Sequence, residues 1–357
     1  MPDKFTSKSI IHVVSSLEVG GAERFVIDLC RLQIGQKMTV AILSFGLEDD
    51  TLVSECEKAG INVFFTAKNK MGKWRDAYLS VNAFNIIHFH SPYPLKFMLP
   101  IMPLCIRKKI IYTRHGADPL SGRSWDYMHK IARLFVNEVS FVSQEGADVF
   151  SRTHGWLRKP KHVIDNGVNL DEVVITRTQN DKTRIGSVGR MIPLKNQICL
   201  LKAITLLPEV KRKAVEVHFF GDGPDLALLK DFVDKNLLQE FVIFHGMVSN
   251  RSNIYNSFDI LTVTSETEGL SLAIMEAMAY YCPVLASNVG GNSKLVVDES
   301  NGYLFDYDDA QKLSDKIAIF IANPELVKAF ALKGRSRIEE QFSLEASVEK
   351  YQKLYFS

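Results

Sequence analysis

The sequence predicts an α/β protein with two Rossmann-like, doubly wound domains that face each other across a crevice. The chain has 357 residues, more than one hydrophobic core usually supports. Short β-branched segments alternate along it with longer amphipathic ones, which is typical of βαβ units in a parallel sheet. A polar stretch without sustained periodicity, residues 169–183, interrupts this alternation, which then starts again. We therefore predict one domain on each side of a linker.

The N-terminal domain is predicted to span residues 1–168 and the C-terminal domain residues 184–340. In the first, the strand candidates are residues 10–16, 38–44, 62–65, 85–90, 109–113 and 138–143, and the first helix candidate is residues 22–33. In the second, the strand candidates are residues 184–189, 215–221, 242–246, 260–265, 283–287 and 302–305. The final segment, residues 341–357, is predicted to be an amphipathic helix that packs back on the N-terminal domain.

The net charge of +2 is unevenly shared along the chain. Residues 1–170 contain 22 Lys and Arg against 16 Asp and Glu, whereas residues 171–357 contain 21 against 25. The basic excess is concentrated between Lys96 and Lys161, where 12 basic residues face 5 acidic ones. Such a patch suits a phosphate-bearing substrate or an acidic membrane surface, and a solvated basic face without a partner explains the same counts equally well.

Cysteine usage and hydropathy indicate where the protein works. The five cysteines are far apart and form no C-x-x-C pair, which argues against a disulfide framework or a zinc site and fits a reducing cytoplasm. Residues 1–16 have too short an apolar run for a signal peptide. The most apolar stretch, residues 97–106, is about half of a membrane span and contains two prolines. We expect a cytoplasmic protein that does not cross the bilayer.

Ligands of open α/β sheets bind beyond the carboxyl ends of the strands, so residues that follow strands are candidates for a site. Gly20 and Gly21 lie between the first strand and a helix, where they either admit an anion or simply form a tight turn, the simpler interpretation. Arg190 and Lys195 follow the first strand of the second domain. Two cations there suit a diphosphate, although a surface pair would look the same in isolation.

Two glutamates with seven residues between them form a stronger pattern. Glu268 lies in a loop after a strand, and Glu276 lies in an apolar run with helical period. The amides of Gly269, Leu270 and Ser271 are predicted at the N-terminus of that helix, where they can donate to an anion or to hydroxyl groups. A capping role explains Glu268 but explains Glu276 poorly, because a buried carboxylate needs a partner. The pair therefore suits a polyhydroxylated ligand.

Histidines and aspartates provide weaker candidates. His115 follows a strand and precedes a glycine, which makes it a reasonable site residue. His88 and His90 alternate along a strand, but a metal site needs a third ligand nearby. Asp306 and Asp308 form a D-x-D, for which a turn is the simpler account. No metal site is predicted.

The motifs occur in a characteristic order along essentially the whole chain. They are GG-x-E, RHG, DNGV, GR-x-x-x-x-K, GDGP and the spaced glutamates, followed by PV-x-A-x-x-x-GG and NGYL. This ordered set resembles the GT-B glycosyltransferases of family 4. The resemblance implies a retaining transfer of a sugar from a nucleotide-activated donor, usually UDP- or GDP-linked, with no obligatory metal and no other cofactor. It also implies an acceptor-side N-terminal domain and a nucleotide-sugar-binding C-terminal domain.

The resemblance assigns roles to the candidate residues. Arg190 and Lys195 would neutralise the donor diphosphate, the leaving group on which charge develops. Glu268 would contact the donor sugar, and Glu276 would hold the nucleotide ribose. Six further residues would lie at the donor or the reacting centre: Gly20, Gly21, His115, Gly269, Leu270 and Ser271. One position departs from the family, because Lys294 stands where a glutamate is common.

Three functional hypotheses follow. The leading one is a cytoplasmic glycosyltransferase that adds one sugar to a lipid-linked intermediate of lipopolysaccharide or capsule, at the inner face of the membrane. Its partners would be the nucleotide sugar, the glycan acceptor and an anionic membrane surface, with no nucleic acid. The alternatives are a sugar-nucleotide epimerase or phosphorylase on the same architecture, and a catalytically degenerate binding protein, for which Lys294 is the only hint.

Overall fold

The computed structural model describes residues 9–116, 120, 122–154, 156, 160–178 and 180–357. The chain forms two compact units. The N-terminal unit comprises Met1–Gly167 together with Leu344–Ser357, and the C-terminal unit comprises Val168–Ser343. In the linker predicted at 169–183, residues 169–178 and 180–182 form neither helix nor strand. None of the helices in the described part of the chain combines the length and the apolar character that spanning a bilayer requires.

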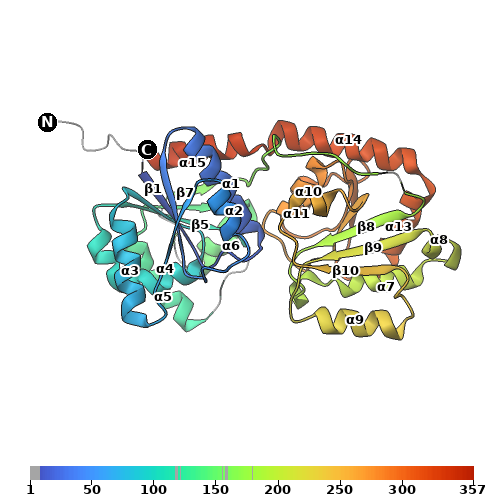
Figure 1. Cartoon of the computed structure of the whole chain (residues 1–357), viewed down its shortest axis with the longest axis horizontal. Coiled ribbons are helices and arrows are strands. Elements are labelled where there is room, and N and C mark those ends of the chain that lie inside the picture. The colour runs from blue at the N-terminus through green and yellow to red at the C-terminus, as the bar shows by residue number, and fades with distance from the viewer. Residues whose placement is uncertain (1–8, 117–119, 121, 155, 157–159, 179) are drawn as a thin grey trace. The chain divides into compact units, whose positions relative to one another are not determined.

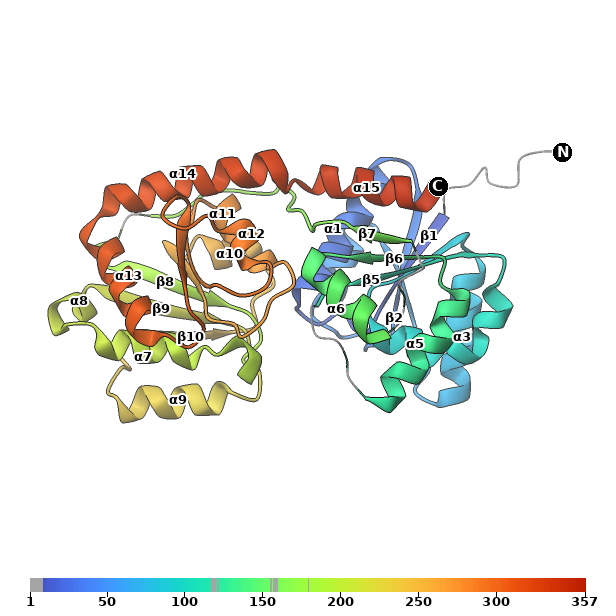
Figure 2. The ribbon, with the colours of Figure 1, turned by 180° about the vertical axis from the view of Figure 1, so that it is seen from behind.

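The N-terminal unit contains a seven-stranded parallel sheet in the order β3-β2-β1-β4-β5-β6-β7. Its strands are β1 Ser9–Val14, β2 Thr39–Ser44, β3 Asn62–Phe65, β4 Ile86–Phe89, β5 Lys109–Arg114, β6 Glu138–Phe141 and β7 Lys161–Val163. Its helices are α1 Gly21–Gly35, α2 Val53–Lys58, α3 Lys70–Asn82, α4 Pro92–Met98, η1 Leu99–Cys105, α5 Arg123–Phe135, α6 Gln144–His154 and α15 Leu344–Phe356 (Figures 1 and 2). The strand order reverses direction between β1 and β4.

The C-terminal unit contains a six-stranded parallel sheet in the order β10-β9-β8-β11-β12-β13. Its strands are β8 Thr183–Val188, β9 Val215–Phe220, β10 Val242–Gly246, β11 Ile260–Val263, β12 Val284–Ser287 and β13 Gly302–Phe305. Its helices are η2 Pro193–Lys195, α7 Ile198–Leu206, α8 Glu209–Lys213, α9 Leu226–Lys235, α10 Arg251–Tyr255, α11 Leu272–Ala279, α12 Asn292–Leu295, α13 Ala310–Ala322 and α14 Pro324–Gln341. Helices α7 and α9 lie on one side of this sheet, and α10 and α11 on the other (Figure 1).

The predicted fold class, two doubly wound Rossmann-like sheets, is confirmed. Every strand predicted from β-branched runs is present, within a few residues of the predicted bounds. Strand β7 was not predicted, because this three-residue edge strand is exposed or half-buried and has no apolar run. The predicted final helix, residues 341–357, starts later than expected, since Gln341 still ends α14 and α15 begins at Leu344.

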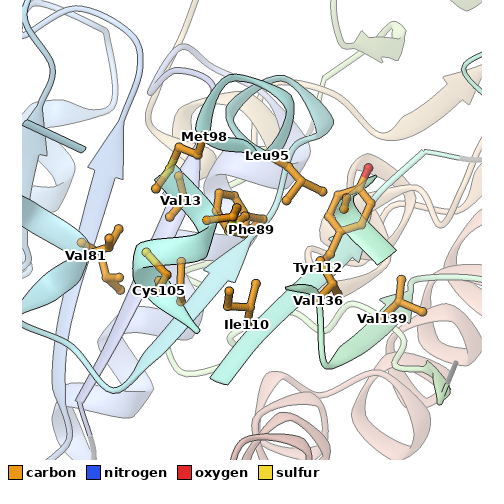
Figure 3. Packing of buried hydrophobic residues seen from close by; sticks show 14 of the residues in the cluster. Val13, Val81, Phe89, Leu95, Met98, Cys105, Ile110, Tyr112, Val136 and Val139 are labelled. Atoms are coloured by element: carbon orange, nitrogen blue, oxygen red, sulfur yellow. The ribbon is translucent and has the colours of Figure 1, made fainter. Parts of the chain in front are cut away.

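The two faces of the N-terminal sheet differ in chemistry. Val13, Phe89 and Ile110, from adjacent strands, point to an apolar core that includes α3, α4 and η1 (Figure 3). Side chains alternate along a strand, so their neighbours point to the opposite face. That face carries a row of buried polar side chains from β1, β4, β5 and β6, namely His12, His88, Thr113 and Ser140. Helices α1 and α15 contact each other, and rings of α15 contact His88 on this face.

Candidate active site

The point where strand order reverses in the C-terminal sheet brings two predicted residues together. Strands β8 and β11 are neighbours, so the segments that follow them meet at one edge of the sheet. Lys195 comes from η2 after β8, and Glu268 comes from the loop after β11. The Lys195 Nζ lies 2.6 Å from Glu268 Oε1, and the two side chains are 26% and 11% exposed. A partly accessible cation thus sits against a carboxylate.

Hydrogen bonds to backbone carbonyls hold these two loops to each other. The N–H of Glu266 donates to the carbonyl of Leu194 at 2.9 Å, and Thr264 Oγ1 donates to the carbonyl of Lys195 at 2.8 Å. Ser265 Oγ also donates to Glu268 Oε1, at 2.7 Å. The relative position of the lysine and the glutamate is therefore fixed by the backbone as well as by their ion pair.

The GG motif after β12 supports the same loop from behind. The N–H of Gly291 donates to the carbonyl of Glu268 at 3.2 Å. A Cβ atom at Gly290 would lie 1.9 Å from that carbonyl oxygen, and one at Gly291 would lie 2.0 Å from the carbonyl oxygen of Gly269. Gly290 also has a φ of +50°, where side chains are strained. Only glycine permits this close approach of two backbones.

Glu276 lies in α11 and is 6% exposed. Its Oε1 accepts from Arg251 Nε at 2.7 Å, and its Oε2 accepts from the Tyr255 hydroxyl at 2.6 Å. A partner was predicted for this carboxylate, but neither Arg251 nor Tyr255 was among the candidate residues. Arg251 and Tyr255 are four positions apart in α10 and therefore share one helix face. That spacing is the only sequence signal that could have indicated them.

The amides expected at the N-terminus of α11 are in place. Ser271 is the N-cap, and its Oγ accepts from the N–H of Ile274 at 3.4 Å. Within the described part of the chain, the N–H groups of Gly269, Leu270 and Ser271 have no hydrogen-bond acceptor. Donors at the positive end of a helix are suited to an anion or to hydroxyl groups.

Arg190 is placed less firmly than Lys195. Its carbonyl accepts from Gln197 Nε2 at 2.9 Å. Its guanidinium is exposed and makes no hydrogen bond or ion pair with another residue that the structure describes. The GDGP turn supports this segment, since the N–H of Met191 donates to the carbonyl of Asp222 at 2.8 Å. The structure thus joins Lys195 to Glu268 but leaves the Arg190 side chain apart from both.

The other predicted residues lie in the N-terminal unit. Gly20 is the N-cap of α1, which begins at Gly21, and Glu23 lies in its first turn. His115 follows β5 and is half-buried, with its Nε2 3.0 Å from Nδ1 of His90. Burial, and next the charge of Arg114, lowers the pKa of His115 to about 4, so the ring is neutral near pH 7.

A third histidine, His12, lies beside His88 and His90, which the sequence alone did not indicate. One ring nitrogen from each of His12, His88 and His90 lies within 4.8 Å of the other two. However, each nitrogen of the three rings already has a hydrogen-bond partner. A metal ion would have to displace these bonds, so the group is better described as a hydrogen-bonded network.

Two family models match the chain, one for each part of it. The model described as "Glycosyltransferase Family 4" matches residues 19–172, and the model described as "Glycosyl transferases group 1" matches residues 171–337. The chain is a GT-B glycosyltransferase of family 4. The predicted family is therefore confirmed.

Individual relatives of this glycosyltransferase are also glycosyltransferases. Poly(ribitol-phosphate) alpha-N-acetylglucosaminyltransferase of Staphylococcus aureus is 30% identical over 174 residues, which are 48% of this chain but only 35% of that enzyme. A Campylobacter jejuni alpha-1,4-N-acetyl-D-galactosaminyltransferase, whose name specifies an undecaprenol-linked substrate, is 22% identical over 97% of both chains. The structure of HepE from Anabaena with UDP and glucose has a TM-score of 0.86 at 19% identity, covering 98% of this chain and 99% of HepE.

The departure from the family pattern lies just after the GG motif. Lys294 is exposed in the short helix α12, and its carbonyl accepts from a guanidinium nitrogen of Arg337 at 2.8 Å. Nothing in the structure explains why this glycosyltransferase has a lysine here instead of the usual glutamate.

Proposed function

We propose that this glycosyltransferase transfers a sugar, with retention of configuration, from a UDP- or GDP-linked donor to a lipid-linked glycan acceptor without an obligatory metal. The observation that carries the proposal is the Lys195–Glu268 pair at the edge of the C-terminal sheet. A cation beside a carboxylate, close to unpaired helix amides, matches a ligand that has both phosphates and hydroxyl groups. UDP is the nucleotide in the HepE structure, which makes a UDP-sugar the first donor to test.

A bound diphosphate would replace Glu268 as the ion-pair partner of Lys195. In the unliganded protein, Glu268 neutralises this ammonium at 2.6 Å. When a diphosphate binds, Lys195 would turn to it, and the exposed Arg190 guanidinium would add a second cation. Glu268 would then be released to accept from hydroxyl groups of the donor sugar. These cations and the amides at α11 would stabilise the charge that develops as the glycosidic bond loosens, the main catalytic task here.

Glu276 is suited to the two adjacent hydroxyl groups of a ribose. An ionised carboxylate offers about four lone-pair sites, and Arg251 and Tyr255 occupy two of them. The remaining sites can accept from both ribose hydroxyls without displacing either partner. The buried ion pair would therefore serve to keep a charged acceptor rigid in an apolar helix.

Retention needs no protein nucleophile in this proposal. A phosphate oxygen held on the face of the sugar that the acceptor attacks can accept the proton of the incoming hydroxyl. His115, neutral near pH 7, would accept a hydrogen bond from a hydroxyl near the reacting carbon. The protein's contribution is then to position the donor and to stabilise the leaving group.

The acceptor side of the proposal rests on the N-terminal unit. Tyr127 and Leu134, on α5, are 68% and 73% exposed, and Arg123 and Lys130 complete the same helical stripe. The neighbouring η1 segment, which contacts α5, exposes Leu104, and Ile106 follows it at 77% exposure. Apolar side chains interleaved with cations suit an anionic bilayer surface. Of the basic stretch between Lys96 and Lys161, Arg158 and Lys159 lie outside the described residues.

Incubation with a panel of UDP- and GDP-sugars tests this proposal. With an undecaprenyl-linked glycan acceptor and EDTA present, we expect release of the nucleoside diphosphate, and NMR of the product should show the anomeric configuration of the donor. An altered donor in the absence of acceptor would indicate an epimerase instead. An inverted product would rule out the retaining mechanism. Nucleotide binding without any turnover over the panel would favour the degenerate binding protein.

A further inference from the structure

A chain of buried hydrogen bonds connects α1 to His115 across the polar face of the N-terminal sheet. Gln33 Oε1 lies 2.8 Å from His12 Nε2, and His12 Nδ1 lies 2.9 Å from His90 Nε2. His90 Nδ1 in turn lies 3.0 Å from His115 Nε2. Gln33 and His12 are fully buried, and His90 is 5% exposed. This series of hydrogen bonds ends at His115 Nδ1, which is shielded from solvent and has no partner among the described residues.

The three imidazoles are neutral, which restricts where their protons lie. Desolvation by burial lowers the pKa of His12 to about 4 and lowers that of His90 well below its ordinary value. The pKa of His115 is likewise lowered to about 4. A neutral imidazole has one N–H donor and one acceptor nitrogen. Each ring therefore donates through one nitrogen and accepts through the other, so the hydrogen bonds run in the same direction along the whole series of rings.

The direction is set at Gln33. A carbonyl oxygen only accepts, so His12 Nε2 carries the proton and His12 Nδ1 is an acceptor. His90 then donates from Nε2 and accepts at Nδ1. His115 consequently donates from Nε2, and its Nδ1 is left with a bare lone pair.

The other end of the Gln33 amide supports this orientation. Its Nε2 donates to the Tyr355 hydroxyl at 3.5 Å, and burial raises the pKa of Tyr355, so this hydroxyl keeps its proton. Tyr355 then donates to His88 Nδ1 at 2.8 Å, and His88 Nε2 donates to Thr113 Oγ1 at 2.6 Å. The reversed amide would end the chain with an unpaired N–H on His115, and orphaned buried N–H groups are rarer than orphaned acceptors.

We propose that Gln33 is a positioning residue that, through His12 and His90, fixes His115 as the Nε2–H tautomer and presents its Nδ1 as an acceptor for a ligand hydroxyl. That the hydroxyl belongs to the sugar donor or to the acceptor rests on the function proposed above. The tautomer itself is a property of the free protein. The residues that decide it lie on α1, on β1 and directly after β4, well away in sequence from the RHG motif.

Nitrogen NMR of the protein labelled with ¹⁵N-histidine tests the tautomer without any substrate. We expect His115, assigned by its loss in His115→Asn, to show a pyridine-like Nδ1 and a pyrrole-like Nε2. The opposite pattern in the wild-type protein would overturn the proposal. Because this measurement needs no substitution at Gln33, it stands even where a variant fails to fold.

Gln33→Met removes the carbonyl while keeping most of the side-chain volume. Averaged nitrogen shifts at His115, which report a mixture of tautomers, are the expected result. Ser151→Ala is the matched control, because it removes a buried hydroxyl of the same unit that donates to the carbonyl of Ala147, outside the chain from Gln33 to His115. His115 shifts that are unchanged in Gln33→Met, or equally changed in Ser151→Ala, would contradict the proposal.

Transfer kinetics provide the second measurement. Gln33→Met should lower kcat by about tenfold to a hundredfold, because a misdirected contact near the reacting centre is costly. The affinity for UDP should not change, since Gln33 is not among the proposed nucleotide contacts. If NMR shows the predicted tautomer but the protein transfers no sugar, this inference stands and the proposed function is rejected. Equal kcat for Gln33→Met and wild type would reject the role of the tautomer.

Discussion

Arg251 Nε donates to Glu276 Oε1 at 2.7 Å, and the two side chains are only 14% and 7% exposed. Such a nearly buried pair joins α10 to α11 and places a charged group inside an apolar helix. Breaking a buried pair leaves an uncompensated charge, whereas replacing both members by apolar residues is often tolerated.

We therefore predict that Arg251→Met destabilises the C-terminal unit by about 3 kcal/mol. The double variant Arg251→Met with Glu276→Leu should recover much of this loss. Urea unfolding followed by far-UV circular dichroism measures the stability of both variants. Tryptophan fluorescence is unsuitable here, because all three tryptophans, Trp74, Trp125 and Trp156, belong to the N-terminal unit. A double variant less stable than Arg251→Met would show that the carboxylate is not the source of the cost.

Lys195→Ala should reduce the rate of sugar transfer by about a hundredfold or more, because it removes a donor from the developing phosphate charge. Calorimetry should also show weaker binding of UDP or GDP. Lys202→Ala is the matched control, because Lys202 is an exposed lysine that lies 3.8 Å from Asp308. If Lys195→Ala binds the nucleotide as tightly as Lys202→Ala does, the proposed phosphate contact is wrong.

Gly291→Ala should displace the loop that carries Glu268, because its Cβ would lie 2.0 Å from the carbonyl oxygen of Gly269. Overpacking of this kind costs about 1–3 kcal/mol. We expect lower thermal stability and lower kcat together. Gly35→Ala serves as the control, since its Cβ would meet nothing within 4 Å. Equal effects of the two substitutions would show that the contact with the loop is unimportant.

Tyr127→Ser combined with Leu134→Ser should weaken binding to phosphatidylglycerol vesicles by about tenfold or more, because the proposed apolar stripe of α5 is lost. Leu228→Ser with Leu332→Ser is the control pair, from exposed positions of the C-terminal unit. Flotation at low and high salt measures the effect. If the wild-type protein does not bind anionic vesicles at low salt, the proposed binding to a membrane surface is wrong.

Acidification should destabilise the N-terminal unit between about pH 6.5 and pH 4. Burial lowers the folded-state pKa of His12 and His115 to about 4, whereas the unfolded histidines titrate near 6.5. In that window the unfolded state binds more protons, so the free energy of unfolding falls as the pH falls, by up to about 1.4 kcal/mol per pH unit for each histidine. Tryptophan fluorescence in urea at several pH values reports this unit. A midpoint independent of pH would show that the histidines are not buried as described.

Most of the architecture could be predicted from the sequence because it depends on local patterns. β-branched runs and amphipathic segments mark strands and helices wherever they are long enough, and only the short edge strand β7 lacked such a signal. The sequence also indicated Lys195, Glu268 and Glu276 as candidates, since each stands just after a strand or breaks an apolar pattern.

The partners of these residues could not be predicted in the same way. Arg251 meets Glu276 across 25 positions, and His12 meets His90 across 78. Such pairs depend on which strands and helices become neighbours, which single residues do not indicate. Gln33 is an unremarkable polar residue in the sequence, and only the fold buries it beside an imidazole.

The place of α15 has a consequence for how the protein is made. Tyr351 and Tyr355, which cover the polar face of the first sheet, are synthesised after all of the C-terminal unit. Until α15 is synthesised, the N-terminal unit lacks these two rings against His88. The packing of this face is therefore completed only after the last residues of the chain have been added.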